Sequence, residues 1–498
     1  MPAFAPLAGN VSADVAIVGG GITGLTAALL LQRAGKKVIV IDAHRLGSGE
    51  TGHTTAHLTA VLDTRYHALE SKFGAEGARA AAESSRAAID RIEAFVGTMD
   101  PGCGFARVPA YLYAETEEQQ RELEKELDAL RRVGLDAGVV DAFPFPLAAR
   151  LAVRIERQAQ MHPLAYLGGL IAQLVTAGGQ IFERTRMVEV EDGQPCRVTT
   201  AHGTITAGHV LVATNQPVSS RFALHTKIAA YRSYAVATRL NQPFPGGLFW
   251  DMQDPYHYTR VERSAAGTFL IVGGEDHKTG QEVDTEQRFS RLKAYLHQLV
   301  PGAPIDHRWS GQIVEPTDGL PFIGHNAGDK HVLVATGYSG NGMTFGTLAG
   351  MILADEAQGI DNPWAPLYRA NRIKPLAQAR EFISENVDFP AYLARDRLGP
   401  GQVSDPAEIP RAEGRLMRAH GKMLAVYRDD SDVLHVHSAV CPHLGCNVRW
   451  NTAERTWDCP CHGSRFDTKG CVLNGPATKD LEPASFPEEG TPILVPAT

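Results

Sequence analysis

The stretch from residue 14 to residue 42 constrains the fold of this 498-residue chain most strongly. It begins with the apolar run VAIV, continues with GGGITG, which matches the pattern G-x-G-x-x-G, and then has an apolar segment of helical length that ends at Gly35. A second run, KVIVI, follows and leads into Asp42. This order predicts a strand, a tight turn, a helix and a second parallel strand, the βαβ unit typical of dinucleotide binding.

Each glycine of the turn has a separate physical role. Gly19 makes the tight turn, Gly21 lets the backbone approach a pyrophosphate, and Gly24 allows the helix to pack closely against the strand. The helix N-terminus then faces phosphate groups, and Asp42 can accept hydrogen bonds from ribose hydroxyls. The unit by itself leaves open whether the nucleotide is NAD or FAD.

Two further stretches favour FAD. Residues 47–56 (GSGETGHTTA) are rich in small and hydroxyl-bearing residues, so the segment can lie close to an extended cofactor and donate hydrogen bonds to it. Residues 332–344 (VLVATGYSGNGMT) predict a strand, a glycine turn and a helix reaching about Gln358, whose N-terminus would face an anion such as reduced flavin. No second strand ending in an acid follows Gly340 and Gly342, which argues against an NAD(P)H domain.

These motifs, together with the strand VLVAT at 210–214 and the aspartate–glycine loop at 317–324, resemble the D-amino-acid-oxidase and glycine-oxidase family of FAD enzymes up to about residue 370. The resemblance implies an α/β FAD-binding domain of Rossmann-like, glutathione-reductase type, with a substrate domain built on an antiparallel sheet. It places Met187 near the adenine. The residues that it implies for FAD binding are Gly19, Gly21, Gly24, Asp42, Thr51, His53, Thr54, Met187, Thr214, Gly337, Gly340, Met343 and Thr344.

His53 carries a separate hypothesis. The run Thr51-Gly52-His53 is similar to the loop of dimethylglycine- and sarcosine-dehydrogenase relatives in which a histidine bonds covalently to the flavin. In other relatives an arginine at this place only contacts the cofactor. Covalent and noncovalent attachment both stay open.

The substrate residues are less distinct. By resemblance, a sheet within residues 227–280 covers the flavin, and Tyr258 and Arg260 are its polar members predicted near a substrate; a structural role for both is an equal alternative. Amino-acid oxidases of this family resemble one another in a Gly-x-Arg-Pro run whose arginine holds the substrate carboxylate. That arginine falls on Ile313 here, so either another arginine takes the role or the substrate is an amine without an α-carboxylate.

Two short loops near the C-terminus hold the densest group of possible metal ligands. CPHLGC, from residue 441, and CPCHGS, from residue 459, contain four of the seven cysteines and two of the nineteen histidines. Each loop offers one Cys and one His, Cys441 with His443 and Cys459 with His462. The pattern suits a [2Fe–2S] centre in which two His replace two Cys on one iron. A zinc site is the alternative, although structural zinc motifs usually pair Cys with Cys and His with His.

The last hundred residues resemble a Rieske domain. The resemblance implies that Cys441 and Cys459 bind one iron and that His443 and His462 bind the other. It also implies a disulfide between Cys446 and Cys461, against the alternative of two reduced thiols, and residues 475–477 (GPA) resemble the loop that covers the cluster. Short strands are predicted at 414–418, 423–427 and 433–437. Further upstream, the pattern predicts a largely helical segment from 66 to 132, a strand over 268–272 that ends at Gly273–Gly274, and a helix over 374–386.

We therefore expect an FAD-dependent oxidoreductase followed by an all-β Rieske domain. The oxidoreductase would oxidise an amine or amino acid at its C–N bond and send electrons through the cluster to an unidentified external acceptor, within one chain or across a homo-oligomer. The alternative is an electron-transfer component that serves a separate oxygenase. The expected boundaries are 1–375 for the oxidoreductase (FAD-binding segments about 10–65, 155–225 and 305–370; substrate-domain segments about 66–154 and 226–304), 376–410 for a linker and 411–498 for the Rieske domain.

Composition sets the remaining limits. Apolar residues make up 44% of the chain and charged residues 21%, as in ordinary globular proteins, and a formal net charge of −8 gives no sign of a nucleic-acid partner. No apolar run reaches the ~18 residues of a membrane span, and the N-terminal MPAFAP lacks the features of a signal peptide. We expect a cytoplasmic protein with a small-molecule substrate.

Overall fold

The computed structural model describes residues 1–99, 102–218, 224–372 and 399–486. The chain divides into two compact units: Met1–His277 with Gln287–Glu385, and Lys278–Glu286 with Asn386–Thr498. Within the described residues, no helix has both the length and the apolar character that a membrane span requires.

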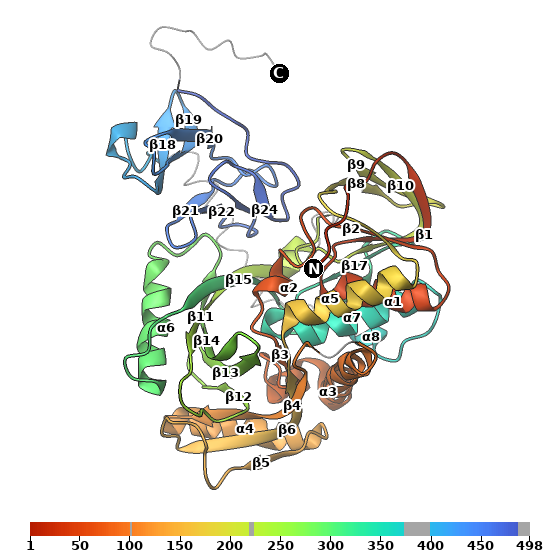
Figure 1. Ribbon diagram of the computed structural model, residues 1–498, viewed down its shortest axis with the longest axis vertical. Helices are drawn as coiled ribbons and strands as arrows, with labels where there is room; N and C mark the ends of the chain where they lie inside the picture. The colour runs from red at the N-terminus through yellow and green to blue at the C-terminus, as the bar shows by residue number, and fades with distance from the viewer. Residues whose placement is uncertain (100–101, 219–223, 373–398, 487–498) are drawn as a thin grey trace. The chain divides into compact units, whose positions relative to one another are not determined.

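A mainly parallel sheet forms the first layer of the first unit (Figure 1). Its strand order is β16–β17–β10–β1–β2–β7, and β16 alone on this path is antiparallel to its neighbour. The bounds are β1 (Val11–Val18), β2 (Val38–Ile41), β7 (Gln180–Phe182), β10 (Gly203–Val212), β16 (Phe322–His325) and β17 (Val332–Thr336). The predicted strand–turn–helix–strand unit is confirmed, because α1 (Ile22–Arg33) lies between β1 and β2.

Successive side chains of a strand point to opposite faces of the sheet, so the sheet packs against two separate hydrophobic clusters. Val15 and Ile17 of β1 pack into one cluster with the helices, whereas Ala16 and Val18 belong to the cluster on the other face. On the first face, α1, α5 (Pro163–Thr176) and α7 (Gly342–Glu356) lie together (Figure 1). On the second face, the antiparallel hairpin β8 (Met187–Glu191) and β9 (Cys196–Thr200) joins β10.

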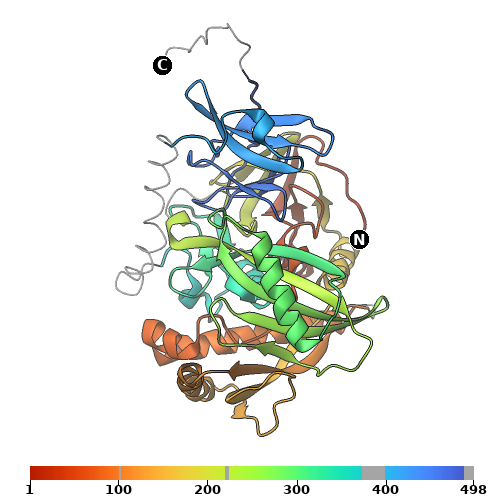
Figure 2. The same cartoon turned by 90° about the vertical axis from the view of Figure 1, so that its left-hand side faces the viewer.

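The second layer is a nine-stranded, mostly antiparallel sheet in the order β15–β11–β14–β13–β12–β4–β6–β3, with β5 beside β6. Helix α6 (Glu286–Leu299) lies across it, as Figure 2 shows, and the ring of Tyr295 stacks on that of His257 at 4.3 Å between centroids. The strands are β3 (His57–Leu58), β4 (Ala106–Ala114), β5 (Ala137–Val139), β6 (Leu151–Gln160), β11 (Ile228–Arg239), β12 (Leu248–Trp250), β13 (His257–Ser264), β14 (Gly267–Lys278) and β15 (His307–Pro316).

Three local expectations differ from the structure or lie outside it. The segment from Tyr66 to Arg132 was predicted to be largely helical, and α3 (Tyr66–Val96) and α4 (Glu117–Arg132) are confirmed, but β4 lies between them and pairs with β6 and β12. The strand predicted to end at Gly273–Gly274 continues to Lys278, because Gly274 takes φ 129° and still pairs with His257. The helix predicted at 374–386 lies outside the described residues.

The second unit contains two small antiparallel sheets, which confirms an all-β domain. Its core surrounds Trp457 and Phe466, both fully buried. The three predicted strands correspond to the first sheet. The bounds are β18 (Glu413–Ala419), β19 (Lys422–Arg428) and β20 (Leu434–Ser438), then β21 (Arg449–Asn451), β22 (Thr456–Asp458), β23 (Arg465–Phe466) and β24 (Val472–Asn474).

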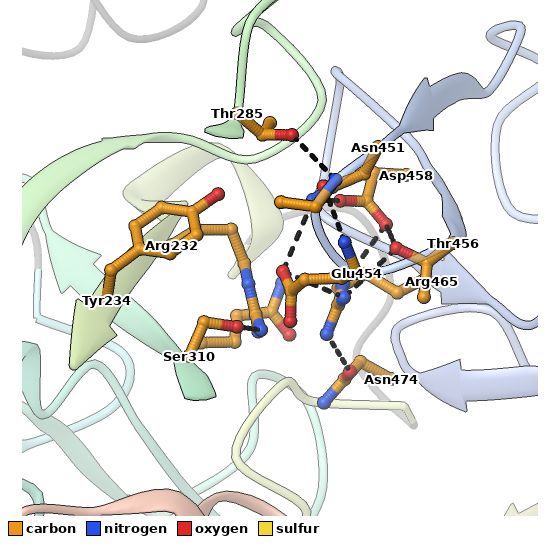
Figure 3. Close-up of polar contacts among 12 residues, drawn as sticks. Arg232, Tyr234, Thr285, Ser310, Asn451, Glu454, Thr456, Asp458, Arg465 and Asn474 are labelled. Carbon is orange, nitrogen blue, oxygen red and sulfur yellow. Dashed lines mark hydrogen bonds and ion pairs between the residues drawn. The ribbon is translucent and has the colours of Figure 1, made fainter. Parts of the chain in front are cut away.

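Lys278–Glu286 groups with this second unit, whereas we expected all of 226–304 in the substrate domain. Gly280 takes φ 72°, and a Cβ atom there would lie 2.8 Å from the carbonyl oxygen of Asp458 and 2.8 Å from the nitrogen of Pro460. Thr285 Oγ1 accepts a hydrogen bond of 3.1 Å from the Ala453 N–H (Figure 3). Only glycine fits at residue 280 without displacing backbone.

Candidate functional site

The glycine turn after β1 is too crowded for side chains. A Cβ atom on Gly19, which takes φ 106°, would lie 2.4 Å from the carbonyl oxygen of Ala213. A Cβ atom on Gly24 would lie 1.9 Å from the carbonyl oxygen of Gly19. Since real Cβ contacts never come this close, both positions require glycine, as the fingerprint predicts.

Two side chains hold this turn in place. Asp42 Oδ2 accepts from the Gly20 N–H at 2.9 Å, and its Oδ1 accepts from the His44 N–H at 2.8 Å. Burial raises the pKa of Asp42, while these backbone hydrogen bonds oppose the rise. Thr51 Oγ1 accepts from the Ile22 N–H at 3.1 Å, at the start of α1. Each Asp42 oxygen has a second lone pair that a ribose hydroxyl could use.

Helices α1 and α7 both begin without a side-chain cap. The residue before α1 is Gly21, and the residue before α7 is Asn341, whose amide instead contacts the Val61 carbonyl and the Asp63 N–H. The first turn of a helix leaves up to four N–H groups without helical partners. At α1 the Thr51 hydroxyl accepts from the first N–H, that of Ile22, and neither N-cap side chain covers the other N–H groups of the first turn. Two such N-termini in one unit are therefore a suitable environment for the phosphates and the ring of a flavin nucleotide.

The loop before α7 is shaped by glycine and anchored to the second layer. Gly337 takes φ 81°, and a Cβ atom on Gly340 would lie 2.9 Å from Asp63 Oδ2 and 3.0 Å from the Tyr256 hydroxyl. Met343 and Thr344 are buried, and Thr344 Oγ1 donates to the Thr59 carbonyl at 3.0 Å. Thr344 thus braces the loop.

Several buried polar atoms near these loops have no hydrogen-bond partner among the described residues: Asn215 Nδ2, Thr317 Oγ1 and His57 Nε2. Asn215 follows Thr214, whose hydroxyl donates to the Gln216 carbonyl. Native proteins satisfy nearly all such atoms, so they indicate that a polar ligand belongs here. Together with the glycine positions that exclude any Cβ, this donor set fits FAD.

The other predicted FAD residues are placed as follows. His53 is exposed at the end of α2 (Glu50–His53), and its carbonyl accepts from Trp309 Nε1 at 2.7 Å. Thr54 Oγ1 accepts from the Ala56 N–H at 3.1 Å. Met187 is buried at the start of β8. Covalent attachment at His53 and the position of Met187 near the adenine stay predictions.

The two predicted substrate residues have different surroundings. The Tyr258 hydroxyl lies 3.3 Å from Ser233 Oγ, and the ring lies directly over Gly273 on the paired strand. Arg260 is buried, and its guanidinium donates to Glu262, to the Thr55 carbonyl and, at 3.4 Å, to the Met161 carbonyl. These contacts occupy the Arg260 guanidinium, which braces the Thr55 loop.

The two cysteine–histidine loops of the second unit share one backbone geometry. In the first, the Cys441 N–H donates to the Cys446 carbonyl and the Gly445 N–H to the Cys441 carbonyl; in the second, Cys459 pairs in the same way with Ser464 and Gly463. Gly445 takes φ 81° and Gly463 φ 74°, where glycine is favoured. Each loop therefore presents its Cys and its His from an equivalent turn.

The structure brings the four predicted ligands together. The rings of His443 and His462 lie 5.0 Å apart between centroids, and burial lowers the pKa of each to about 4, so both are neutral and able to bind metal. Cys441 and Cys459 are buried and hydrogen-bonded to each other, which lowers the pKa of Cys441. Ser464 also hydrogen-bonds to Cys441, and its Oγ accepts from the Ala477 N–H at 3.0 Å.

The predicted disulfide is confirmed, since Cys446 and Cys461 are bonded with their Cα atoms 6.5 Å apart. It joins the two ligand loops. Geometry alone does not separate an iron–sulfur cluster from a zinc ion here, because both would use the same four side chains.

Comparison with known proteins identifies both the nucleotide cofactor of the first unit and the metal centre of the second. The model of the family described as FAD dependent oxidoreductase (DAO) matches residues 14–356. The chain belongs to this family. The model of the Rieske [2Fe-2S] domain matches residues 400–487. The chain is thus a DAO-family FAD oxidoreductase with a C-terminal Rieske domain, and its cofactors are FAD and a Rieske [2Fe–2S] cluster.

One relative matches nearly the whole chain, and the two others below match about three quarters of it. The "Putative Rieske 2Fe-2S iron-sulfur protein YhfW" of Bacillus subtilis (strain 168) is 32% identical over 97% of this chain and 95% of its own length. The "Gamma-glutamylputrescine oxidoreductase" of Escherichia coli (strain K12) is 27% identical over 72% of this chain and 86% of its own. The crystal structure of glycine oxidase from Geobacillus kaustophilus superposes with a TM-score of 0.62 at 21% identity, covering 73% of this chain and 100% of that one, which shows the shared fold.

Within this DAO-family unit, the sequence analysis did not single out Asp276 or Asp63. Asp63 Oδ2 accepts from the Gly340 N–H at 2.5 Å. Asp276 lies beside Ser233 and Tyr258, two residues beyond the double glycine. The signal in the sequence is an acid pair, Glu275-Asp276, directly after the apolar run 269–272 and the two glycines, and a strand pattern does not tell which acid faces which side.

Proposed function

We propose that this chain oxidises an amine at its C–N bond and delivers the electrons, through its Rieske cluster, to an external acceptor. The observation that carries the proposal is the union of an amine- or amino-acid-oxidase-type FAD unit and a Rieske unit in one chain. The Bacillus subtilis relative shares that union over nearly its whole length. When bound, FAD takes two electrons as a hydride from the carbon beside an amine, and a [2Fe–2S] cluster carries electrons singly.

The residues of the chain contribute binding and orientation. Gly19 makes the tight turn and Gly24 allows the close helix–strand packing that the turn needs, while Asp42 and Thr51 hold the turn that would face the pyrophosphate. Cys441, Cys459, His443 and His462 are the proposed cluster ligands, and the disulfide holds their loops together. Ser464 donates a hydrogen bond to the Cys441 sulfur, which favours the more negative, reduced state of a cluster bound there.

An amine substrate without an α-carboxylate fits the charges best. Ile313 occupies the place of the carboxylate-binding arginine, and the Arg260 guanidinium is committed to Glu262 and two carbonyls. Tyr258 is the polar side chain of this sheet face that we propose contacts the substrate. The name of the Escherichia coli relative refers to a putrescine derivative, whose putrescine nitrogens have no carboxylate on the adjacent carbon, although its glutamyl group has one; this supports an amine as the substrate class.

The course of the chain also supports an internal electron relay. Strand β14 of the oxidoreductase unit runs directly into Lys278–Glu286, which belongs to the second unit. Gly280 of that segment lies against the backbone of Cys459 and Pro460, and Gln281 Nε2 donates to the Pro460 carbonyl at 3.4 Å. Strand β14 therefore continues along the chain into a segment that contacts the second ligand loop.

The decisive experiment is an anaerobic titration of the oxidised holoprotein with a panel of primary, secondary and poly-amines and amino acids. Flavin absorbance and the electron paramagnetic resonance signal of the reduced cluster are recorded together. We expect an amine to bleach the flavin and to reduce the cluster in the same preparation. A cluster that stays oxidised beside a fully bleached flavin refutes the relay, and rapid bleaching by NADH would instead favour an electron-transfer component for a separate oxygenase.

A matched variant separates the two steps. In His443→Ala, a ligand of the cluster is lost while the FAD unit is unchanged. We expect this variant to retain flavin bleaching by the amine and to lose the reduction of one-electron acceptors such as ferricyanide. Unchanged ferricyanide reduction would show that electrons leave directly from the flavin.

A further inference from the structure

Strand β14 changes the direction of its side chains just after its double glycine. Gly274 takes φ 129° and Glu275 takes φ 57°, a left-handed conformation that is uncommon outside glycine. The Glu275 carboxylate consequently lies with His257 Nε2, at 3.5 Å, and with Arg288 of α6, at 3.2 Å. Irregular residues of this kind re-aim neighbouring side chains in strands beside active sites.

Asp276 does not share the surroundings of Glu275: it lies beside Ser233 and Tyr258. The charge of Asp276 acts on the Tyr258 hydroxyl, and that hydroxyl lies 3.3 Å from Ser233 Oγ. Asp276 is therefore on the sheet face that carries Tyr258, the predicted substrate residue, and Ser233, which pairs with Gly311 of β15. Gly311 in turn lies against the loop predicted to contact FAD: a Cβ atom on Gly311 would lie 3.3 Å from Glu50 Oε2 and 3.7 Å from the Cβ of His53.

The carboxylate of Asp276 forms no ion pair with any of the described residues. Both of its oxygens are shielded from solvent, and neither has a hydrogen-bond partner of ordinary geometry among the described residues, although the Ser233 hydroxyl is close enough to favour the charged form. Burial raises the pKa of Asp276 to about 7, an effect that this hydroxyl opposes. A shielded carboxylate without a cationic partner is costly, so proteins keep such a group mainly where a ligand completes it.

The neighbouring charges show what kind of ligand would complete it. Asp63 and Glu275 add negative charge around Asp276, and Glu315 does so around the adjacent Tyr256. Arg288, which opposes them, is paired with Glu275 on the α6 side. This environment repels a carboxylate and attracts a cation.

We propose that Asp276 binds the positively charged nitrogen of the substrate, so that the substrate class is a cationic amine with no carboxylate beside that nitrogen. The inference rests on the proposed function, because it concerns the same site. It assigns Asp276 as a specificity-determining residue, with Tyr258 beside it and with Asp63 and Glu315 setting the sign of the local potential.

The test uses three ligands of one shape and different charge: tert-butylammonium, tert-butanol and pivalate. The carbon that bears the nitrogen of tert-butylammonium has no hydrogen, so the flavin cannot oxidise this probe, and binding is measured apart from turnover. Dissociation constants for the oxidised holoprotein come from anaerobic calorimetry and from the perturbation of the flavin spectrum. We expect tert-butylammonium to bind at least tenfold more tightly than either of the other two.

Asp276→Asn keeps the shape of the side chain and removes its charge. We expect it to weaken tert-butylammonium binding at least tenfold and to leave tert-butanol binding unchanged, since one charge-assisted hydrogen bond is lost. Asp306→Asn is the matched control: Asp306 is exposed and accepts from the Arg239 N–H at 2.6 Å, away from this face. It should bind all three probes as the natural protein does.

Three results would overturn the inference: pivalate binding more tightly than tert-butylammonium, equal binding by Asp276→Asn, or no binding of tert-butylammonium at the highest soluble concentration. The comparison of the three probes in the natural protein stands even if the variant does not fold. Bleaching of the flavin by an amine in the earlier titration does not depend on any of these three results. Failure of this inference is therefore distinguishable from failure of the proposed function.

Discussion

Removing the Asp458 carboxylate should destabilise the Rieske unit strongly. Asp458 and Arg465 are paired across β22 and β23, on either side of the second ligand loop, with Arg465 Nε 3.0 Å from Asp458 Oδ1 (Figure 3). The side chains are only 2% and 7% exposed. Asp458 also accepts from Asn451 Nδ2 at 3.0 Å and from the Thr456 hydroxyl at 2.8 Å. Asp458→Ala therefore leaves several buried donors without an acceptor.

The magnitude follows from burial. Breaking a buried ion pair by removing one partner costs about 3–5 kcal/mol, because the remaining charge stays buried. Glu454 remains 3.1 Å from Arg465 Nη2, so we expect the lower end, about 3 kcal/mol. For a domain of ~60–100 residues each kcal/mol lowers the melting temperature by roughly 4–8 °C, which predicts a loss of at least ~12 °C.

The assay is thermal melting followed by the visible circular dichroism of the cluster, with flavin absorbance as the internal reference for the first unit. Asp430→Ala is the matched control, because its ion pair with Arg455 spans 3.2 Å but the side chains are 73% and 52% exposed. We expect that control to change stability by less than about 0.5 kcal/mol. A cluster transition of Asp458→Ala within ~4 °C of the control would refute the assignment of Asp458 as a buried, stabilising partner.

Three further predictions follow from single contacts. Gly24→Ala places a Cβ atom 1.9 Å from a backbone carbonyl in the glycine turn, so purified protein should contain almost no FAD by absorbance while keeping its cluster signal. Ser464→Ala removes a hydrogen bond to the Cys441 sulfur and should lower the cluster potential by about 40 mV in a redox titration, the equivalent of ~1 kcal/mol; an unchanged potential would contradict it. Although burial lowers it, hydrogen bonds to two carboxylates raise the pKa of His257 from 6.5 to about 9, so its contribution to stability is complete below pH 6.5 and is lost as the pH rises through about 9. The melting temperature of the flavin unit should fall over that interval, and His257→Gln should flatten the fall.

Much of the site was predictable because its chemistry is local in the chain. The glycine turn is predicted to hold phosphates through backbone groups of six consecutive residues, and crowding such as that between Gly24 and Gly19 leaves no choice of residue there. The ligand loops are also short and share one turn geometry, with a left-handed glycine before the final hydrogen-bonded residue in each. Where a few adjacent residues perform the chemistry, their pattern in the sequence is sufficient to identify it.

Other features depend on residues far apart in the chain. Arg260 lies in a segment with an ordinary strand pattern, which does not reveal the partners of its guanidinium. Only the folded structure shows that the guanidinium contacts the carbonyls of Thr55 and Met161. Strand β4 was missed because its pairing partners, β6 and β12, lie elsewhere in the sequence, while the charged helices on either side dominate the local pattern.

The sequence alone therefore determined the two cofactors, the order of the units and the pair of ligand loops. Tertiary structure decided that Lys278–Glu286 joins the second unit and that Glu275 and Asp276 contact different groups. The physical reason is that burial and charge pairing are sums over neighbours from several strands. A residue such as Asp276 acquires its property, a carboxylate without a partner, only when those strands assemble.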